Sequence, residues 1–513
     1  MQTLVQFVSV EAAPPSLGDN TGDLDRLKKA LQVNLAGREL VVSYARMAEV
    51  AGRFRQAGFS GCAVICDMPG RFEIVDFLAQ TPAVLPAMAL DLGTTHLEAS
   101  LINLLDGSIL ARGNRENAQI NYGADILSRI HFAAGHEGLD KLHQEIINCI
   151  NKLAAQLAGK ADLTTEEIRA LSVSGNTTMI HLFLRLDPYH LCREPYIPLV
   201  NDPDPCRAGD LGLNLHEKGV VWVMPSVGSY FGGDLISGIL ASGLDRSEDT
   251  CMLIDVGTNA EVVLGNREWL IACAGAAGPA LEGGVARMGM RAGPGAIEHV
   301  RIDPDSGRID FQTIDNRPPR GICGSGIIDL VAAFYLARII DIRGKFRGVG
   351  YEDRFIETDE GLAFIVAHGG ESANGEPVVI GQVDLDAMIR SKAAMYSILT
   401  TITSQVGLEF SDLKRIYVAG AFGRHIDPRQ AITLGMLPDL PLDTFEPIGN
   451  SSLAGAEQVL LERNDRERCR EMISKITYLE LNVNQEFMLR FSGSRFIPHT
   501  DRTLFPSVPV FDD

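Results

Sequence analysis

The stretch that decides the fold is AMALDLGTTHLEASLINLLDG, residues 87–107. Its apolar run ends in Asp91, the loop Gly93-Thr94-Thr95 follows, and alternating residues then lead to a closing turn. This pattern predicts a strand, a tight turn and a second strand. Gly93 would let the backbone approach a phosphate, Thr94 and Thr95 would add donors, and the Asp91 carboxylate could hold hydrated Mg²⁺. An ordinary hairpin with an aspartate at its edge explains this stretch alone equally well.

A second copy of the pattern favours a nucleotide site over an ordinary hairpin. The stretch CMLIDVGTNAEVVLG, residues 251–265, has an apolar run, Asp255, the loop Gly257-Thr258-Asn259, then Glu261 and another apolar run. A repeat at this distance predicts two similar half-domains, each of which offers a phosphate loop to one nucleotide. Asp255 would hold hydrated Mg²⁺ as Asp91 does, and Glu261 or Asp255 could orient an attacking water.

Two further helix starts carry candidate polar residues. A strand over 168–173 is followed by Ser174 and by Gly175-Asn176-Thr177, which favour an anion at the start of the next helix. Plain capping by Asn176 or Thr177 is an equally good interpretation. Asp234 follows two glycines at another helix start, where it either caps the helix or faces the second phosphate loop as a metal ligand.

Two glycine-rich turns complete the set of candidate binding segments. Gly324 and Ser325 precede a helix, and such small residues suit close packing at a domain interface. A strand over 415–419 ends in Gly420-Ala421-Phe422-Gly423, where bare backbone would accept the flat adenine or ribose of a nucleotide. GxxG after a strand is a weak signal alone, but it is informative as the third feature of this order.

The length, composition and net charge of the chain exclude several classes of protein. The chain has 513 residues, of which 46% are apolar and 22% charged, as is usual for a soluble globular protein. A net charge of −20 without a basic run argues against a nucleic-acid partner. No apolar run approaches the ~20 residues of a membrane span, and the start lacks the features of a signal peptide. We therefore expect a cytoplasmic protein with no membrane partner.

The order of predicted elements suggests three parts. Residues 1–84 alternate strands and helices as a small α/β domain, with a last helix expected over 71–80. Residues 85–222 would form half-domain I, and residues 223–513 half-domain II with a C-terminal tail. The nine cysteines are odd in number and include no full set of iron–sulfur ligands.

The order LDLGTT, SVSGNTT, IDVGTNAE, ICGSGI and VAGAFG resembles the five-part signature of the actin, sugar-kinase and heat-shock-chaperone (ASKHA) superfamily. Within it, ENAQINYGADILSRI, GGVARMGMRAGPGAIE and AGAFGRHID resemble the reductive activators of corrinoid-dependent methyltransferases. The resemblance covers the chain from about residue 5. It implies an α/β fold with a two-lobed, actin-like ATPase of duplicated RNase H-like half-domains, and ATP with Mg²⁺ as ligands.

Such activators usually begin with a [2Fe–2S] domain, and this chain starts where the segment after that domain would start. We therefore expect no iron–sulfur cluster in this chain, and electrons from a separate ferredoxin-like donor. The resemblance implies a corrinoid protein or corrinoid-dependent methyltransferase (cobalamin-type cofactor) as partner, and such activators also pair as homodimers in some cases.

Three functions are open at this point. The first is ATP-dependent activation, in which ATP binding and hydrolysis are coupled to reduction of Co(II) to Co(I). The second is a nucleotide-responsive binding or chaperone module for a corrinoid protein or methyltransferase, without redox activity. A small-molecule kinase is a weaker third, because no base for a substrate hydroxyl is evident in the sequence.

Overall fold

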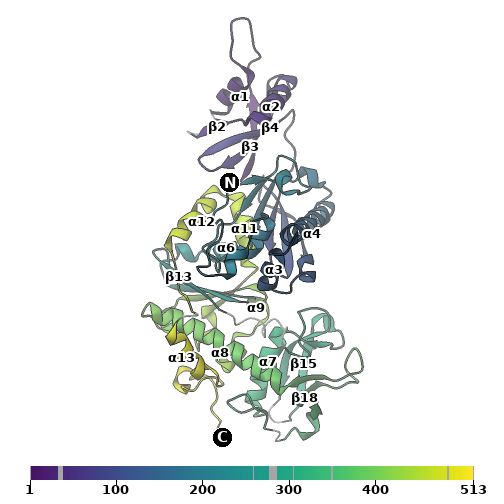
Figure 1. The fold of residues 1–513 in the computed structure, drawn as a ribbon, viewed down its shortest axis with the longest axis vertical. Coiled ribbons are helices and arrows are strands. Elements are labelled where there is room, and N and C mark those ends of the chain that lie inside the picture. Colours follow the sequence, from purple (N-terminus) through teal and green to yellow (C-terminus); the bar gives the residue numbers. More distant parts are fainter. Residues whose placement is uncertain are drawn as a thin grey trace. The chain divides into compact units, whose positions relative to one another are not determined.

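The computed structural model describes residues 2–32, 38–257, 259–275, 286–303, 306–347, 350–481 and 484–511. The chain divides into two compact units (Figure 1). Unit 1 comprises Met1–Ala241 and Ser452–Ser474, and unit 2 comprises Ser242–Ser451 and Lys475–Asp513. Among the described residues, no helix combines the length and the hydrophobicity that crossing a membrane would take.

Unit 1 begins with a four-stranded sheet of order β1-β3-β4-β2 that packs against two helices (Figure 1). The elements are β1 (Val5–Glu11), α1 (Asp23–Gln32), β2 (Glu39–Val41), α2 (Tyr44–Gln56), β3 (Ser60–Met68) and β4 (Arg71–Leu78). The core includes Phe54, whose ring meets those of Phe59 and Phe77 edge-on at 5.1 and 5.0 Å between centroids. A small α/β domain therefore forms here.

The helix expected over 71–80 is wrong, because these residues form strand β4. Pro69 and Gly70 make a two-residue turn in which Gly70 has a φ of +73°, and Met68 pairs with Arg71 across it. The turn forces the chain back along β3 as an antiparallel hairpin. The run FEIVDFL is then almost wholly buried, so its apolar content reflects a covered strand rather than one face of a helix.

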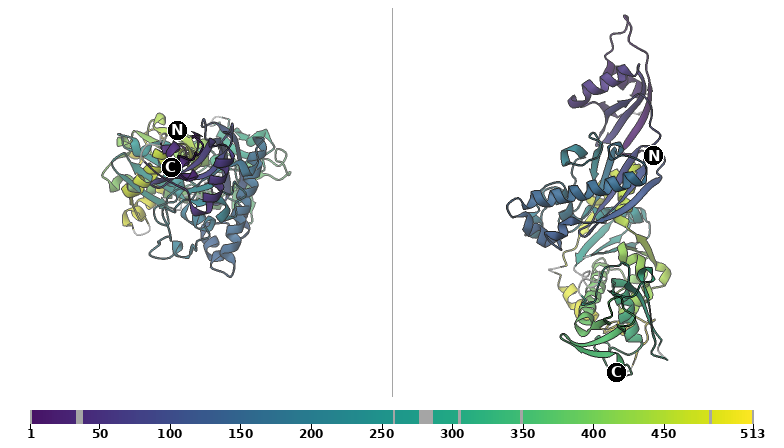
Figure 2. Two further views of the ribbon diagram at one scale, coloured as in Figure 1. Left: turned by 90° about the horizontal axis from the view of Figure 1, so that it is seen from above. Right: turned by 90° about the vertical axis from the view of Figure 1, so that its right-hand side faces the viewer.

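The second sheet of unit 1 has the order β7-β6-β5-β8-β10-β9. Its strands are β5 (Pro86–Leu92), β6 (His96–Asn103), β7 (Ile109–Glu116), β8 (Ala170–Ser174), β9 (Cys206–Arg207) and β10 (Val220–Val223). β5, β8 and β10 are parallel, whereas β6 and β7 continue antiparallel from β5. The long helix α4 (Gly138–Lys160) buries its apolar face against this sheet, as the blue helix in Figure 2 shows. Further α-helices in the described part of unit 1 are α3 (Ile126–Ala133), α5 (Thr177–Phe183), α6 (Gly233–Ser242), α11 (Ser451–Leu461) and α12 (Arg463–Lys475). One terminal residue each of α6, α11 and α12 lies across the unit boundary.

The main sheet of unit 2 repeats the same topology. Its order is β21-β20-β11-β12-β13-β22, with β11, β20 and β21 parallel and β12 and β13 antiparallel. The strands are β11 (Cys251–Val256), β12 (Ala260–Gly265), β13 (Leu270–Gly275), β20 (Arg415–Ala419), β21 (Phe445–Gly449) and β22 (Ile476–Tyr478). In both sheets the strand that carries the DxGT motif pairs with an antiparallel neighbour on one side and a parallel neighbour on the other. The predicted duplication of half-domains is confirmed.

Among its described residues, unit 2 also has two three-stranded sheets and five α-helices. The sheets have the orders β15-β14-β16 and β17-β18-β19. Their strands are β14 (Ala296–Ile302), β15 (Ile309–Thr313), β16 (Gly321–Ile322), β17 (Phe355–Thr358), β18 (Gly361–Ala367) and β19 (Val378–Gly381). The helices are α7 (Gly324–Leu336), α8 (Gln382–Gln405), α9 (Gly420–His425), α10 (Pro428–Leu434) and α13 (Gln485–Ser494). Helices α8 and α13 lie side by side (Figure 1).

Buried ion pairs join the N-terminal domain to the rest of unit 1. The buried Asp67 of β3 accepts hydrogen bonds from Arg38 at 2.7 Å and from Arg463 and Arg466 of α12 at 2.6 Å each. A second group surrounds Asp76 of β4, which pairs with Arg169, the residue before β8, at 3.2 Å. The N-terminal domain is therefore tied to α12 and to the start of β8 by largely buried charged groups.

The second of these groups contains a histidine with a perturbed pKa. Burial lowers the pKa of His216 to about 4, and the cations Arg169, Lys218 and Arg46 act in the same direction. The His216 Nδ1 accepts a hydrogen bond from the Lys218 backbone amide at 3.1 Å, which requires an unprotonated Nδ1.

Unit 1 should lose stability as the pH falls from about 6.5 to about 4. In that window the unfolded chain binds a proton at His216 that the folded chain does not, so acid favours unfolding. We expect the variant His216→Gln to show a smaller fall in Tm between pH 7 and pH 4.5 than the wild type. The exposed His136 provides the matched control, His136→Gln, which should follow the wild type. Parallel curves for all three proteins would contradict the assignment.

Candidate functional site

The first phosphate loop follows β5 directly. Asp91 is the last residue but one of β5, and the loop Gly93-Thr94-Thr95 connects it to β6. The Asn117 Nδ2 donates to the Gly93 carbonyl at 3.0 Å and fixes the loop. A Cβ at Gly93 would lie 2.4 Å from the His96 carbonyl oxygen, so only glycine fits this tight turn.

The turn after β8 lies beside this loop. Asp91 pairs with Ser174 across the parallel strands β5 and β8. Asn176 accepts from the Met179 amide at 3.0 Å as the cap of α5, and its Nδ2 donates to Thr94 Oγ1 at 3.1 Å. The capping interpretation is thus confirmed for Asn176, and the same side chain also contacts the predicted phosphate loop. Thr177 lies inside α5 and donates to the Gly228 carbonyl at 3.0 Å.

Asp234 belongs to the same cluster. The backbone of Gly232 is in close contact with the preceding turn, since a Cβ there would lie 2.3 Å from the Asn176 Cα. Helix α6 begins at Gly233, so Asp234 lies in its first turn and accepts from the Leu235 amide at 2.9 Å. The expectation that Asp234 is the N-cap is therefore wrong, because the helix starts one residue earlier. In unit 1, Asp91, the first phosphate loop, residues 175–177 and Asp234 thus lie together near the carboxyl ends of the parallel strands β5 and β8.

Ser452 completes the unit 1 cluster and was not among the residues predicted. It lies in the first turn of α11, and its Oγ is 2.7 Å from Asp91 Oδ1 and 2.9 Å from Ser174 Oγ. The sequence shows only a Gly-Asn-Ser-Ser turn before a helix at this point, which suits any helix start. Contact with a residue so distant in the chain has no local signal.

Unit 2 brings a second set of candidates together. Asp255 on β11 is opposite Glu261 on β12 and opposite Ala419 on β20. Gly420 has a φ of +74°, and a Cβ there would lie 3.2 Å from Asp255 Oδ1. The Gly257 amide donates to the Asn259 carbonyl at 2.9 Å and closes the second turn.

At some predicted residues the structure differs from the expectation, and others lie outside the described part of the chain. Residues 420–423 form the start of helix α9 rather than an open loop, because a Cβ at Gly423 would lie 2.1 Å from the Val418 carbonyl oxygen and only glycine lets the chain coil so tightly. Thr258 and the side chains of Ala421 and Phe422 lie outside the described part of the chain. Gly324 and Ser325 are buried at the start of α7, which packs against β14.

The candidate cation ligands in the two units are carboxylates. Within the described residues, no group of three or more His, Cys, Asp and Glu side chains could hold a metal ion. Mg²⁺ in nucleotide sites typically keeps several waters and uses one or two carboxylates with the phosphates. Asp91 and Asp234 in unit 1 and Asp255 in unit 2 provide that kind of oxygen ligand.

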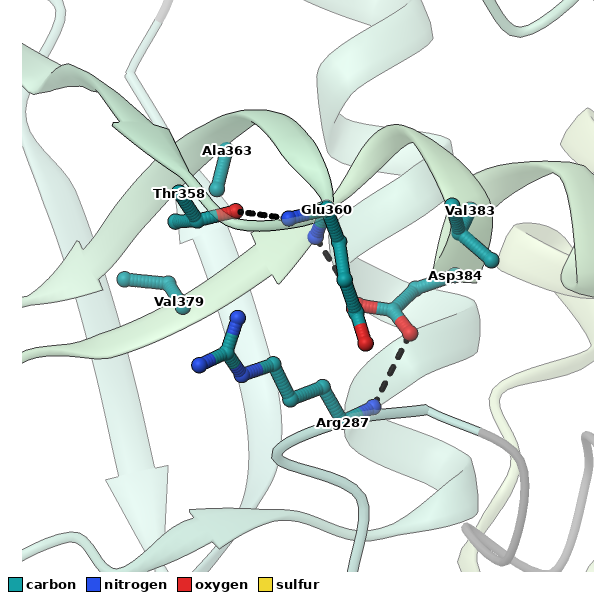
Figure 3. Close-up of a pocket in the computed structure, with 8 residues that line it drawn as sticks. Arg287, Thr358, Glu360, Ala363, Val379, Val383 and Asp384 are labelled. Atoms are coloured by element: carbon teal, nitrogen blue, oxygen red, sulfur yellow. Dashed lines mark hydrogen bonds between the residues drawn. The ribbon is translucent and has the colours of Figure 1, made fainter.

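A separate pocket in unit 2 contains none of the predicted residues (Figure 3). It is lined in part by Arg287, Glu360 and Asp384. The Asp384 carboxylate already accepts from the backbone amides of Arg287 at 2.9 Å and Gly381 at 2.8 Å. The Arg287 side chain pairs with Asp359 at 2.5 Å. The side chains of Asp384 and Arg287 are thus engaged in structural contacts.

Two sheets of the same topology, each with one DxGT strand, define an ASKHA-type protein. Family models agree: the model described as the C-terminal ASKHA domain of RACo matches residues 249–509, the RACo middle region matches residues 86–247, and the RACo linker region matches residues 1–79. The chain belongs to the RACo family.

The chain is similar to several named proteins. The chain is 33% identical over 426 residues to "Corrinoid activation enzyme RamQ" of Eubacterium limosum, covering 81% of this chain and 71% of the relative. It is 25% identical over 425 residues to "[Co(II) methylated amine-specific corrinoid protein] reductase" of Methanosarcina barkeri, covering 76% and 72%. A solved "Reductive activator for corrinoid,iron-sulfur protein" is 38% identical with a TM-score of 0.90, over 99% of this chain and 81% of that one.

Proposed function

We propose that this protein is an ATP-dependent reductive activator of a corrinoid protein. It binds ATP with Mg²⁺ and couples ATP hydrolysis to the reduction of inactive Co(II) to Co(I), with electrons from a separate ferredoxin-like donor. The observation that carries this proposal is the likeness, over 99% of the chain, to a solved reductive activator for a corrinoid iron–sulfur protein. Reduction of Co(II) to Co(I) is steeply uphill for ordinary donors, so a second source of free energy is needed.

The predicted residues divide the work of nucleotide binding. Asp91 and Asp255 hold hydrated Mg²⁺, with Asp234 close to the first of them. Gly93-Thr95 and Gly257-Asn259 bind the phosphates, and Gly420-Gly423 the adenosine. Glu261 or Asp255 orients the attacking water. Support comes from the clustering of these residues at the same edge of each duplicated sheet. In this proposal residues 85–222 and 223–513 act as the two half-domains, and the protein works in the cytoplasm.

The direct test follows the cobalt oxidation state. The purified protein is mixed with a corrinoid protein in the Co(II) state and a reduced ferredoxin, with and without Mg·ATP. The corrinoid iron–sulfur protein and a methylated-amine-specific corrinoid protein are the two substrates to compare. We expect the absorbance of Co(I) to appear with Mg·ATP and not with a non-hydrolysable analogue. ATP-dependent binding without Co(I) would instead support a chaperone module, and no nucleotide effect with either substrate would contradict both.

A further inference from the structure

Three buried serines form a continuous chain of hydroxyls that ends at Asp91. Ser237 Oγ lies 2.8 Å from Ser174 Oγ, Ser174 Oγ lies 2.9 Å from Ser452 Oγ, and Ser452 Oγ lies 2.7 Å from Asp91 Oδ1. Ser174 and Ser237 are 0% exposed, and Ser452 is 6% exposed. These residues come from four elements of unit 1, namely α6, β8, α11 and β5.

The Ser452 hydroxyl is bound to a charged group. An ionised carboxylate only accepts hydrogen bonds, so the Ser452 Oγ donates to Asp91 Oδ1. The Ser174 Oγ lies within hydrogen-bond distance of both the Ser452 Oγ and the Ser237 Oγ. A hydrogen bond to a charged group is stronger than one between neutral groups, and neighbouring hydrogen bonds in a buried setting strengthen it further.

Backbone packing keeps the serines at these distances. A Cβ on Gly455 of α11 would lie 2.5 Å from the Ser237 Cα, so α11 and α6 touch at a glycine. Ser172 of β8 donates to the Ala456 carbonyl of α11 at 2.6 Å. Helix α11 is therefore fixed against both β8 and α6 one turn after Ser452, which limits the freedom of Ser452 to move away from Asp91.

We propose that Ser452 is a positioning residue for Asp91, and that Ser174 and Ser237 complete a hydroxyl chain that fixes the carboxylate for Mg²⁺ and nucleotide. Ser452 acts through Asp91 and does not itself contact the reacting atoms. This inference rests on the proposed function, because it assigns a task to the Asp91 carboxylate. It adds a residue outside the five motifs of the family signature.

The test compares Ser452→Ala with variants that separate positioning from stability. Ser452→Ala should lower kcat for ATP hydrolysis about tenfold and raise the Mg²⁺ concentration for half-maximal activity about tenfold, since a hydrogen bond to a charged group is lost. The KM for ATP should stay within about twofold of the wild type, because the glycine-rich loops remain. Ser452→Thr keeps the hydroxyl and should restore most of kcat.

One further variant is a control for lost stability, and another tests the far end of the hydroxyl chain. Ser397→Ala removes a fully buried serine hydroxyl of α8 in unit 2, where Ser397 donates to the Ala393 carbonyl at 2.6 Å. It should leave kcat and the Mg²⁺ requirement unchanged, with a fall in Tm like that of Ser452→Ala. Ser237→Ala removes the last member of the chain without touching Asp91, and should lower kcat about twofold to threefold. If Ser452→Ala does not fold, Ser237→Ala still tests the proposal.

The outcomes distinguish the two proposals. If Ser452→Ala and Ser237→Ala hydrolyse ATP with the Mg²⁺ dependence of Ser397→Ala, the positioning role is wrong. If the wild type hydrolyses no ATP, the proposed function fails, and the Mg²⁺ dependence of ADP binding by calorimetry decides the role of Ser452. An unchanged Mg²⁺ requirement in Ser452→Ala would then overturn it. A wild type that binds no nucleotide would overturn both.

Discussion

Replacement of Asp91 by asparagine is expected to lower the rate of ATP hydrolysis at least about 100-fold. Asparagine keeps the shape of the side chain and can still accept the hydrogen of Ser452, so the fold should persist. The change removes the negative charge that would hold hydrated Mg²⁺ against the phosphates. Steady-state ATPase assays and nucleotide binding measure the effect, and cobalt reduction should fall in parallel.

The next hairpin of the same sheet offers a matched control. Asp106 lies at the turn between β6 and β7, where its side chain accepts from the Ser108 amide at 2.9 Å. Asp106→Asn removes the same charge from this neighbouring hairpin and should leave ATP turnover unchanged. If Asp91→Asn hydrolyses ATP at the wild-type rate, Asp91 is not part of the nucleotide site.

A double variant tests whether the two DxGT strands serve one nucleotide. Asp91 belongs to unit 1 and Asp255 to unit 2. If both carboxylates serve the same Mg·ATP, Asp91→Asn combined with Asp255→Asn should be little worse than either single change, because groups that act as a unit are strongly non-additive. Independent sites would instead give multiplied losses.

Asp67→Ala should cause the largest loss of stability, about 3–5 kcal/mol, because it leaves buried cations without their anion. The carboxylate contacts Arg38, Arg463 and Arg466, and the Arg466 side chain is only 7% exposed. For a unit of this size we expect a fall in Tm of about 10 °C. Thermal unfolding followed by circular dichroism measures the change.

An exposed ion pair gives the comparison for Asp67. Asp140 pairs with Arg185 at 2.6 Å, but both side chains are more than half exposed. Asp140→Ala should leave Tm nearly unchanged, because water screens such pairs. Equal effects of Asp67→Ala and Asp140→Ala would show that the buried group does not stabilise the junction.

Much of the fold could be predicted because its signals are local. The duplication is visible in two DxGT stretches, and the strand over 415–419 is found with the same bounds. The strand β4 was missed because a buried strand and a buried helix look alike in a short apolar run, and the Pro69-Gly70 turn was the only local sign of a hairpin.

The site could be predicted only where its residues belong to motifs. Asp91 and Asn176 lie in glycine-rich turns that attract attention, and the structure places their segments side by side in unit 1. Ser452 could not be found, because a serine at a helix start is ordinary and its contact with Asp91 depends on tertiary packing. The N-cap interpretation of Asp234 disagrees with the structure, because two glycines before it left the start of the helix ambiguous and α6 begins at Gly233.

Helix α11 also has a consequence at its far end. Its first turn contacts Asp91 through Ser452, and its last turn accepts a hydrogen bond from the Leu4 amide at the Leu460 carbonyl, at 2.8 Å. A helix of this length is a stiff rod of about 16 Å. One rigid helix therefore connects the Asp91 carboxylate with the chain segment that leads into strand β1 of the N-terminal sheet.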